Sequence, residues 1–316
     1  MLTPDASNPD ASNPDMPQWD DVVDVLCYGH GFGVLATAIS AADADGTVLL
    51  VRPAAEAGND RVLFSAIDDL QTREYLDELS VDVPEGGAAT GLVLETVTEV
   101  APADIGAPIE PFYGARLHDW AGQCLMSPYG VLYTRLPDQA MTAMKGPSGE
   151  VVQVRSVGTF TPERGADVEA SVNDWLAAAA RERALEVMDG AALQRIVFED
   201  GEVVGAVLVT ADGVRAVRVR HGIAMATGLS ERHSEWVDRS FDTDQSLQVA
   251  VVGRSASRFG RIELLRTESE PPTEPPTPSV TSSYCRSRRV RDGLRDAGRS
   301  DVRRCRKMHR YPPLGE

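Results

Sequence analysis

The stretch from residue 21 to residue 52 constrains the fold of this chain more than any other. It reads as an apolar strand over residues 22–26, a turn with three glycines, an alanine-rich helix over residues 32–44 and a second apolar strand over residues 48–51. Strand, glycine turn, helix and strand in this order predict a βαβ unit with two parallel strands. Apolar and polar residues do not alternate in the first strand, which is typical of a strand buried on both faces.

The glycine turn is the first candidate site. A turn that binds the pyrophosphate of a dinucleotide needs one glycine for a tight bend, a second for close approach of the backbone and a third for close helix packing. Gly29 and Gly31 supply the first two, but Val34 holds the third position, with Gly33 one residue early. A valine there is expected to push the helix outward. His30 is either an exposed turn residue or a donor to phosphate. Such a turn fits a nucleotide site and a structural strand-to-helix turn alike.

Residues 151–228 carry the clearest pattern after the βαβ unit. The segment Ser171-Val172-Asn173-Asp174 looks like a capping box with Asp in place of Glu, and it predicts a helix that runs from there through Leu185. Strands over 193–198, 203–209 and 214–219 follow. Their separators, Asp200-Gly201 and Asp212-Gly213, favour turns with positive φ, so we expect a three-stranded antiparallel meander. Another short apolar run over 223–226 ends at Thr227-Gly228.

A third region combines aromatic and cationic residues between residues 111 and 135. Arginine binds carboxylates bidentately and histidine titrates near neutrality, so such residues are candidates for holding a dicarboxylate or relaying a proton. The alternative is a packed core, which the neighbouring Leu117, Trp120 and Leu132 favour. The candidates between residues 111 and 135 are Arg116, His118, Tyr129, Tyr133 and Arg135.

Two further elements are predicted earlier in the chain. Helical spacing over 67–79 predicts a helix, and residues 91–97 look like a strand.

Three of these stretches together resemble the fumarate reductase/succinate dehydrogenase flavoprotein family. Residues 22–52 look like its N-terminal FAD motif, and residues 175–206 are similar to the helix, strand and meander that precede its second flavin contact. The run His221-Gly222-Ile223-Ala224-Met225-Ala226-Thr227-Gly228 looks like its strand ending in Ala-Thr-Gly. The resemblance covers most of residues 20–228. It implies an α/β fold, namely the Rossmann-like FAD-binding fold of flavoproteins with two dinucleotide-binding domains, with an antiparallel β-meander.

The resemblance also implies a cofactor and an activity. The cofactor is FAD, and the activity is hydride transfer between the flavin and a carbon pair of a small-molecule substrate. No catalytic residue is carried over from the family, and no metal site is expected. The residues implied for cofactor binding are Gly29, His30, Gly31, Phe32, Gly33, Arg52, Ala226, Thr227 and Gly228.

The chain also departs from the family pattern. The Ser/Gly-rich loop expected after the second strand is replaced by residues 53–60, and Leu229 stands where a second glycine follows Thr227-Gly228. Arg52 occupies the position of the acidic residue that binds a ribose, and an arginine there suits the 2′-phosphate of NADP. Two alternatives therefore stay open: an NADP-dependent reductase, which the meander and the lack of a Tyr-x-x-x-Lys pair disfavour, and a noncatalytic remnant of a flavoprotein.

Charge and cysteine content exclude several classes of protein. The 316 residues carry a net charge of −17. Residues 281–316 hold eleven Lys/Arg and four Asp/Glu, a charge of +7, so the rest carries −24. Such an acidic body argues against nucleic acid or an anionic membrane as the main partner.

The four scattered cysteines predict neither a disulfide framework nor a zinc site, and they fit a reducing cytoplasm. No apolar run approaches the length of a membrane span. The sequence does not indicate an oligomeric state.

Composition divides the chain into three regions. Residues 1–18 contain a repeated Asp-Ala-Ser-Asn-Pro and are expected to be a disordered arm. Residues 19–265 are expected to form the FAD-binding α/β domain. Residues 266–316 combine a Pro/Thr linker with an Arg-rich disordered tail, which is read as a solvated extension, a basic tether or a segment translated out of frame.

Overall fold

The computed structural model describes residues 16–54, 67–80, 91–100, 113–136, 141–227 and 245–267. All of them fall within one compact unit, Met1–Pro271. The expectations for the repeat arm and for the linker and Arg-rich tail lie almost wholly outside the described residues, and the domain boundaries stay predictions.

The predicted βαβ unit is present. Strand β1 (Asp21–Tyr28), helix α1 (Phe32–Asp43) and strand β2 (Val48–Arg52) follow one another, and the two strands pair in parallel with Val25 opposite Val48. Leu26 and Cys27 are fully buried in β1, as expected for a strand covered on both faces.

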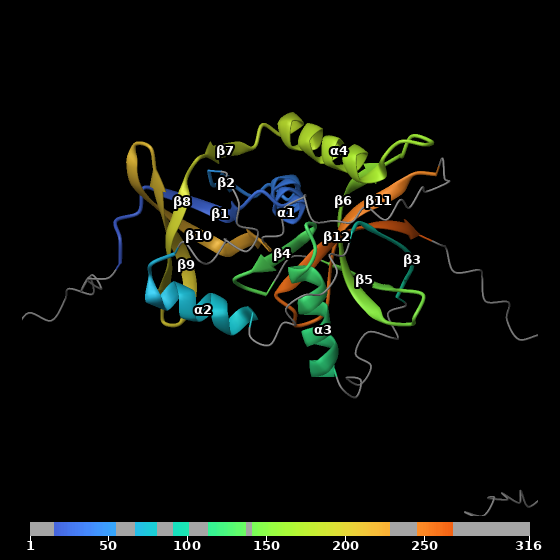
Figure 1. Cartoon of the computed structure of the whole chain (residues 1–316), viewed down its shortest axis with the longest axis horizontal. Coiled ribbons are helices and arrows are strands. Elements are labelled where there is room, and N and C mark those ends of the chain that lie inside the picture. The colour runs from blue at the N-terminus through green and yellow to red at the C-terminus, as the bar shows by residue number, and fades with distance from the viewer. Residues whose placement is uncertain are drawn as a thin grey trace, which may run out of the picture. The chain divides into compact units, whose positions relative to one another are not determined.

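Two further strands extend this unit to four parallel strands, in the order β10-β1-β2-β7. β7 enters beside β2 after helix α4, and β10 enters beside β1 at the end of the meander (Figure 1). Because all four strands are parallel, their carboxyl ends meet at one edge of the sheet. The added elements are α4 (Val168–Glu182), β7 (Glu186–Asp189) and β10 (Gly213–Ala226).

The antiparallel meander is also confirmed. β8 (Ala192–Glu199) pairs with β9 (Glu202–Thr210), and β9 pairs with β10. Asp200 and Gly201 both have positive φ, 51° and 82°, as the two-residue turn between β8 and β9 requires.

One boundary prediction in the meander is wrong. The run 223–226 is not a separate strand but the end of β10. A bulge in β10 separates residues 214–219 from the run 223–226. Val23 of β1 pairs with Val219 and Val25 pairs with Gly222, so β10 has one residue more than β1 between these pairs. Gly222 has a φ of 111°, which lets the strand continue through the extra residue.

The predicted start of the long helix is wrong as well. α4 begins at Val168, and Asp167 is its N-cap, since the Asp167 carboxylate accepts hydrogen bonds from the backbone N–H groups of Glu169 and Ala170. Ser171 lies within the first turn, and its hydroxyl donates to the Asp167 carbonyl at 2.7 Å. An aspartate one turn earlier satisfies the free N–H groups and therefore takes the capping role.

Five strands outside the βαβ unit close into a ring, in which only the strand over 91–97 was predicted. Their order is β11-β6-β5-β3-β12, and β12 pairs back with β11. β4 (Gly130–Tyr133) pairs with both β12 and β10 and so joins the ring to the parallel strands. The ring consists of β3 (Val93–Glu99), β5 (Thr142–Lys145), β6 (Val151–Phe160), β11 (Leu247–Gly253) and β12 (Phe259–Thr267).

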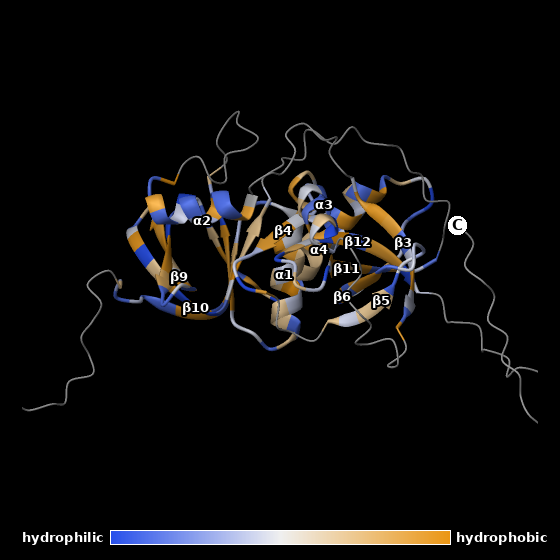
Figure 2. Ribbon diagram, turned by 90° about the horizontal axis from the view of Figure 1, so that it is seen from below, coloured by the Kyte–Doolittle hydropathy of each residue, from blue (hydrophilic) through white to orange (hydrophobic). Residues whose placement is uncertain are grey.

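The remaining two helices are α2 (Leu70–Ser80) and α3 (Tyr113–Leu125). α2 fulfils the helical spacing seen over 67–79, and the Thr72 hydroxyl accepts a hydrogen bond from the Ile196 backbone N–H of β8 at 2.9 Å. Much of α2 is hydrophilic, whereas the strands around α1 are largely hydrophobic (Figure 2). Among the described residues, no helix has both the length and the apolar character needed to cross a membrane, and no acidic, His or Cys cluster could hold a metal ion.

Asp24 fastens β1 to the start of β2 and makes stability depend on acid pH. Its carboxylate accepts hydrogen bonds from the Thr47 backbone N–H and hydroxyl, each at 2.8 Å, and from Arg220 at 2.9 Å. These bonds, led by the Thr47 N–H, lower the pKa of Asp24 from 3.8 to about 2. A lowered pKa stabilises the fold above the unfolded pKa, and this contribution is lost as pH falls through the folded pKa.

We therefore expect Asp24→Asn to cost stability at neutral pH and progressively less as the pH falls from about 4 towards about 2. Urea unfolding of both proteins across this pH range measures the difference. A difference that stays constant with pH would contradict the prediction.

Candidate functional site

The glycine turn Gly29-His30-Gly31 lies at the carboxyl edge of the four parallel strands. β1 ends there at Tyr28, β10 at Ala226, β2 at Arg52 and β7 at Asp189. The carboxyl edge of such a sheet is where open α/β folds bind ligands. The structure thus brings most of the predicted cofactor residues together at one edge.

Gly29 and Gly31 are required by the close approach of the turn to β10. Gly29 has a φ of 121°, and a Cβ atom on it would lie 2.6 Å from the Ala226 Cβ. A Cβ atom on Gly31 would lie 2.9 Å from the same atom. Ala226 is therefore the surface against which the turn packs.

Gly33 takes the part expected of the third glycine, although it stands one residue early. A Cβ atom on it would lie 2.5 Å from the Gly130 carbonyl oxygen and 2.8 Å from that of Tyr129, so α1 passes very close to the start of β4. The expectation that Val34 pushes the helix outward is wrong. Val34 is 1% exposed and packs in one cluster with Val25 and Cys27 of β1.

The N-terminus of α1 is suited to an anion. Its N-cap is Gly31, no side chain caps it, and its first turn holds no acidic residue. The free N–H groups of a first turn, together with the helix dipole, favour a negatively charged group. This is the arrangement that a pyrophosphate would need.

The side chains of His30 and Phe32 are engaged within the protein. The exposed His30 donates a hydrogen bond from Nε2 to the Pro53 carbonyl at 2.6 Å, which ties the turn to the end of β2. Phe32 stacks on Tyr129 with ring centroids 5.2 Å apart. Of the two interpretations of His30, this geometry favours the turn residue.

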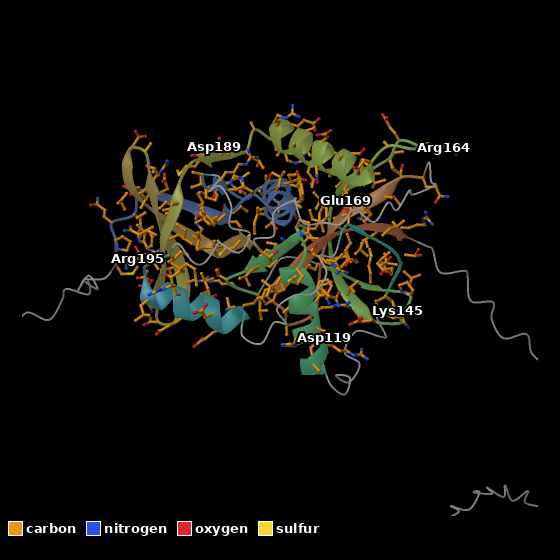
Figure 3. All side chains as sticks on the ribbon, in the orientation of Figure 1. Asp119, Lys145, Arg164, Glu169, Asp189 and Arg195 are labelled. Atoms are coloured by element: carbon orange, nitrogen blue, oxygen red, sulfur yellow. The ribbon has the colours of Figure 1, made fainter. Side chains whose placement is uncertain are left out.

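Arg52 and Asp189 end adjacent strands in register, and the Gly190 N–H donates to the Arg52 carbonyl at 2.7 Å. The Arg52 side chain is half-buried and forms no hydrogen bond or ion pair with the part of the chain that the structure describes. Asp189 is exposed at the end of β7 (Figure 3). A cation and a carboxylate thus lie at the position where a ribose or its phosphate would be held.

Thr227 has a structural partner. Its hydroxyl lies 3.0 Å from the Cys124 carbonyl and 3.1 Å from the Ser127 carbonyl, so it donates to the C-terminal end of α3. The Thr227 hydroxyl proton is therefore already used within the protein. Gly228, the last predicted cofactor residue, lies outside the described residues.

The aromatic and cationic candidates separate into three groups. Arg116 and His118 are exposed on α3, and Tyr129 is fully buried, as are the core candidates Trp120 and Leu132. Tyr133 and Arg135 line one cavity. The core interpretation therefore holds for much of this region.

Cys27 and Cys124 are buried free thiols. Burial raises the pKa of both thiols, so neither is a reactive thiolate.

A buried charge network in the strand ring escaped sequence reasoning. Arg261 and Glu263 of β12 are 8% and 4% exposed, and Nε of Arg261 lies 2.7 Å from Oε1 of Glu263. The Arg261 and Arg254 guanidinium carbons lie 4.8 and 4.7 Å from the centre of the Trp120 ring. Burial raises the pKa of Glu263, and the charge of Arg261 opposes this shift. Two charges spaced two residues apart are also what the solvent face of a strand shows, so no sequence signal distinguished them.

No family model and no curated protein matches the sequence. Among solved structures, the chain is similar to 3-ketosteroid-Δ4-(5α)-dehydrogenase from Rhodococcus jostii RHA1 in complex with 4-androstene-3,17-dione, at 18% identity over 67% of this chain and 47% of that one, with a TM-score of 0.30.

Two further structures are similar at the same level. One is the open conformation of a flavocytochrome c3 fumarate reductase, at 16% identity over 64% of this chain and 33% of that one, with a TM-score of 0.30. The other is a ternary complex of aklavinone-11 hydroxylase with FAD and aklavinone, at 20% identity over 65% of this chain and 32% of that one, with a TM-score of 0.25. The chain spans less than half the length of these three proteins. Likenesses this weak do not establish what the chain binds or does.

Proposed function

We propose that this chain is an FAD-binding flavoprotein, most like the fumarate reductase/succinate dehydrogenase flavoproteins. One observation carries the proposal: the uncapped N-terminus of α1 follows Gly29 and Gly31 at the carboxyl edge of four parallel strands. The meander that leads into β10 supports it, because β10 ends at Ala226 against the same turn.

The residues present fit the pyrophosphate of FAD. The backbone of Gly29, Gly31 and Phe32 would hold the pyrophosphate, and Ala226 with the Thr227 backbone would lie towards the flavin. When bound, FAD supplies hydride transfer to or from a small-molecule substrate. The chain's own contribution is to orient the cofactor through the rigid β1–α1 turn. No side chain is assigned a catalytic role.

A negative charge introduced at His30 tests the pyrophosphate site. His30 is exposed, and a glutamate there would face the phosphates while remaining favourable for the α1 dipole. We expect His30→Glu to weaken FAD binding by about tenfold or more and to leave the stability of the FAD-free protein within about 1 kcal/mol. His30→Gln is the matched control, because its amide retains a donor for the Pro53 carbonyl. FAD titration followed by flavin fluorescence measures the affinities, and equal affinities for the two variants would contradict the proposed site.

Arg52 supports a second candidate, an NADP-dependent reductase. Its guanidinium, which has no hydrogen bond or ion pair among the described residues, would meet a 2′-phosphate at the end of β2. Thermal unfolding with each nucleotide separates the candidates, since a ligand that binds only the folded state raises the melting temperature. Protection by FAD and flavin absorbance support the first proposal, whereas selective protection by NADP supports the second. Protection by neither supports a noncatalytic remnant.

A further inference from the structure

A second concave site lies beside the middle of α1, away from the glycine turn. It is a cavity of about 350 Å³ between α1, β4, β6 and β10. Its inner wall includes the buried side chains of Thr37, Ala41 and Ala224, while Leu136 and His221 at its edge are 51% and 59% exposed. This volume is at the lower end of the range of small-molecule sites.

Basic side chains line the cavity. Arg135, Arg155, Arg220 and His221 all contribute to it. Two of the three guanidinium groups already have a carboxylate partner, because Arg220 lies 2.9 Å from Asp24 and Nε of Arg135 lies 3.6 Å from Glu202.

Arg155 differs from the other two arginines. It is half-buried on β6, and within the described part of the chain its side chain has neither a hydrogen bond nor an ion pair. An anion in the cavity would provide the counter-charge that this guanidinium lacks among the described residues.

The bulge in β10 shapes this site. Arg220 and His221 lie between the register pairs Val23–Val219 and Val25–Gly222, opposite the single residue Asp24. A bulge redirects side chains and is common next to binding sites. Here it brings Arg220 and His221 to the cavity.

Tyr133 adds no negative charge. The Thr37 hydroxyl donates its single proton to the Gly33 carbonyl at 2.8 Å, so Tyr133 must be the donor in its 2.9 Å hydrogen bond to Thr37. Burial raises the pKa of Tyr133 to about 12, which keeps the phenol neutral at physiological pH. The groups facing the cavity are therefore cationic or neutral, apart from the paired carboxylates.

We propose that this cavity binds a small carboxylic acid with a short apolar body. The Arg155 guanidinium would bind the carboxylate, in the bidentate geometry that suits the two groups. Val25, Leu136 and Ile223 would contact the carbon chain. The site uses none of the residues proposed to hold FAD and does not depend on that proposal.

The test uses butyrate and its neutral isostere butyramide. Binding is measured by isothermal titration calorimetry at constant ionic strength, on the full chain both without flavin and with added FAD. We expect saturable binding of butyrate, with butyramide binding at least about tenfold more weakly, the factor expected for loss of one charge-assisted hydrogen bond.

Variants locate the binding. Arg155→Gln is expected to weaken butyrate binding by about tenfold or more, and Arg155→Lys by less, because it keeps the charge. Arg73→Gln, which removes one exposed charge from α2, is the matched control and should leave the affinity unchanged. Thermal unfolding confirms that each variant is folded. No butyrate binding, equal binding of butyramide, inorganic phosphate bound in place of butyrate, or equal affinity in Arg155→Gln would each overturn the proposal.

Discussion

Gly33→Ala is expected to lower the free energy of unfolding by about 3 kcal/mol. The added Cβ atom would lie 2.5 Å from the Gly130 carbonyl oxygen and 2.8 Å from that of Tyr129. Both obstacles are backbone atoms at the start of β4, so the clash is relieved only by moving α1 away from the sheet. Urea unfolding of the flavin-free protein measures the loss without any contribution from cofactor binding.

Gly114→Ala provides the matched control for this substitution. Gly114 also lies in the first turn of a helix, α3, but a Cβ atom on it would have no atom within 4 Å. Alanine is the better helix former, so stability should stay the same or rise by up to about 1 kcal/mol. Equal changes in the free energy of unfolding for the two substitutions would show that helix propensity, and not the close approach of α1 to β4, determines the effect of Gly33→Ala.

Arg261→Met is expected to destabilise the protein by about 3–5 kcal/mol at neutral pH. Glu263 is 4% exposed and would lose the cation that lies 2.7 Å from its carboxylate. Trp120 would lose one of its two guanidinium contacts. Arg254 does not replace the missing partner, because it is bound to Glu150 at 2.8 Å.

The pH dependence of this loss identifies its cause. Burial already raises the pKa of Glu263, and removal of Arg261 should raise it further. A carboxyl group with a raised pKa contributes stability at low pH, and this contribution is lost as pH rises through the folded pKa. The destabilisation caused by Arg261→Met should therefore be larger at about pH 8 than at about pH 4. The double variant Arg261→Met/Glu263→Leu should recover most of the stability, since it removes both charges. A double variant as unstable as the single one would show that packing, not charge, is responsible.

Local order along the chain was largely predictable from sequence. The βαβ unit and the meander depend on neighbouring segments and on turn residues such as Asp200-Gly201, whose conformational preference is local. The start of α4 was misplaced because Ser171 and Asp167 both resemble caps, and only the position of the first free N–H groups decides between them.

The strand ring was not predictable in the same way. Of the pairings described for β12, only the one with β11 is local; β12 also pairs with β3 and β4, and β11 with β6, which lie far away in sequence, and no local pattern specifies such partners. The proposed cofactor residues could be named from sequence because they lie within short motifs. Arg155 was missed because it reaches its cavity from β6, far along the chain from Thr37 and Arg220.

The parallel pairing of β1 with β10 has a consequence for biosynthesis. Val25 pairs with Gly222, so the first strand of the sheet cannot complete its pairing until most of the described chain has been made. At the 5–20 residues per second of translation, this interval lasts about 10–40 s. During it, the apolar β1 has only β2 beside it and an open edge exposed to other chains. The final pairing joins segments about 200 residues apart in sequence, and such long-range pairing is slow.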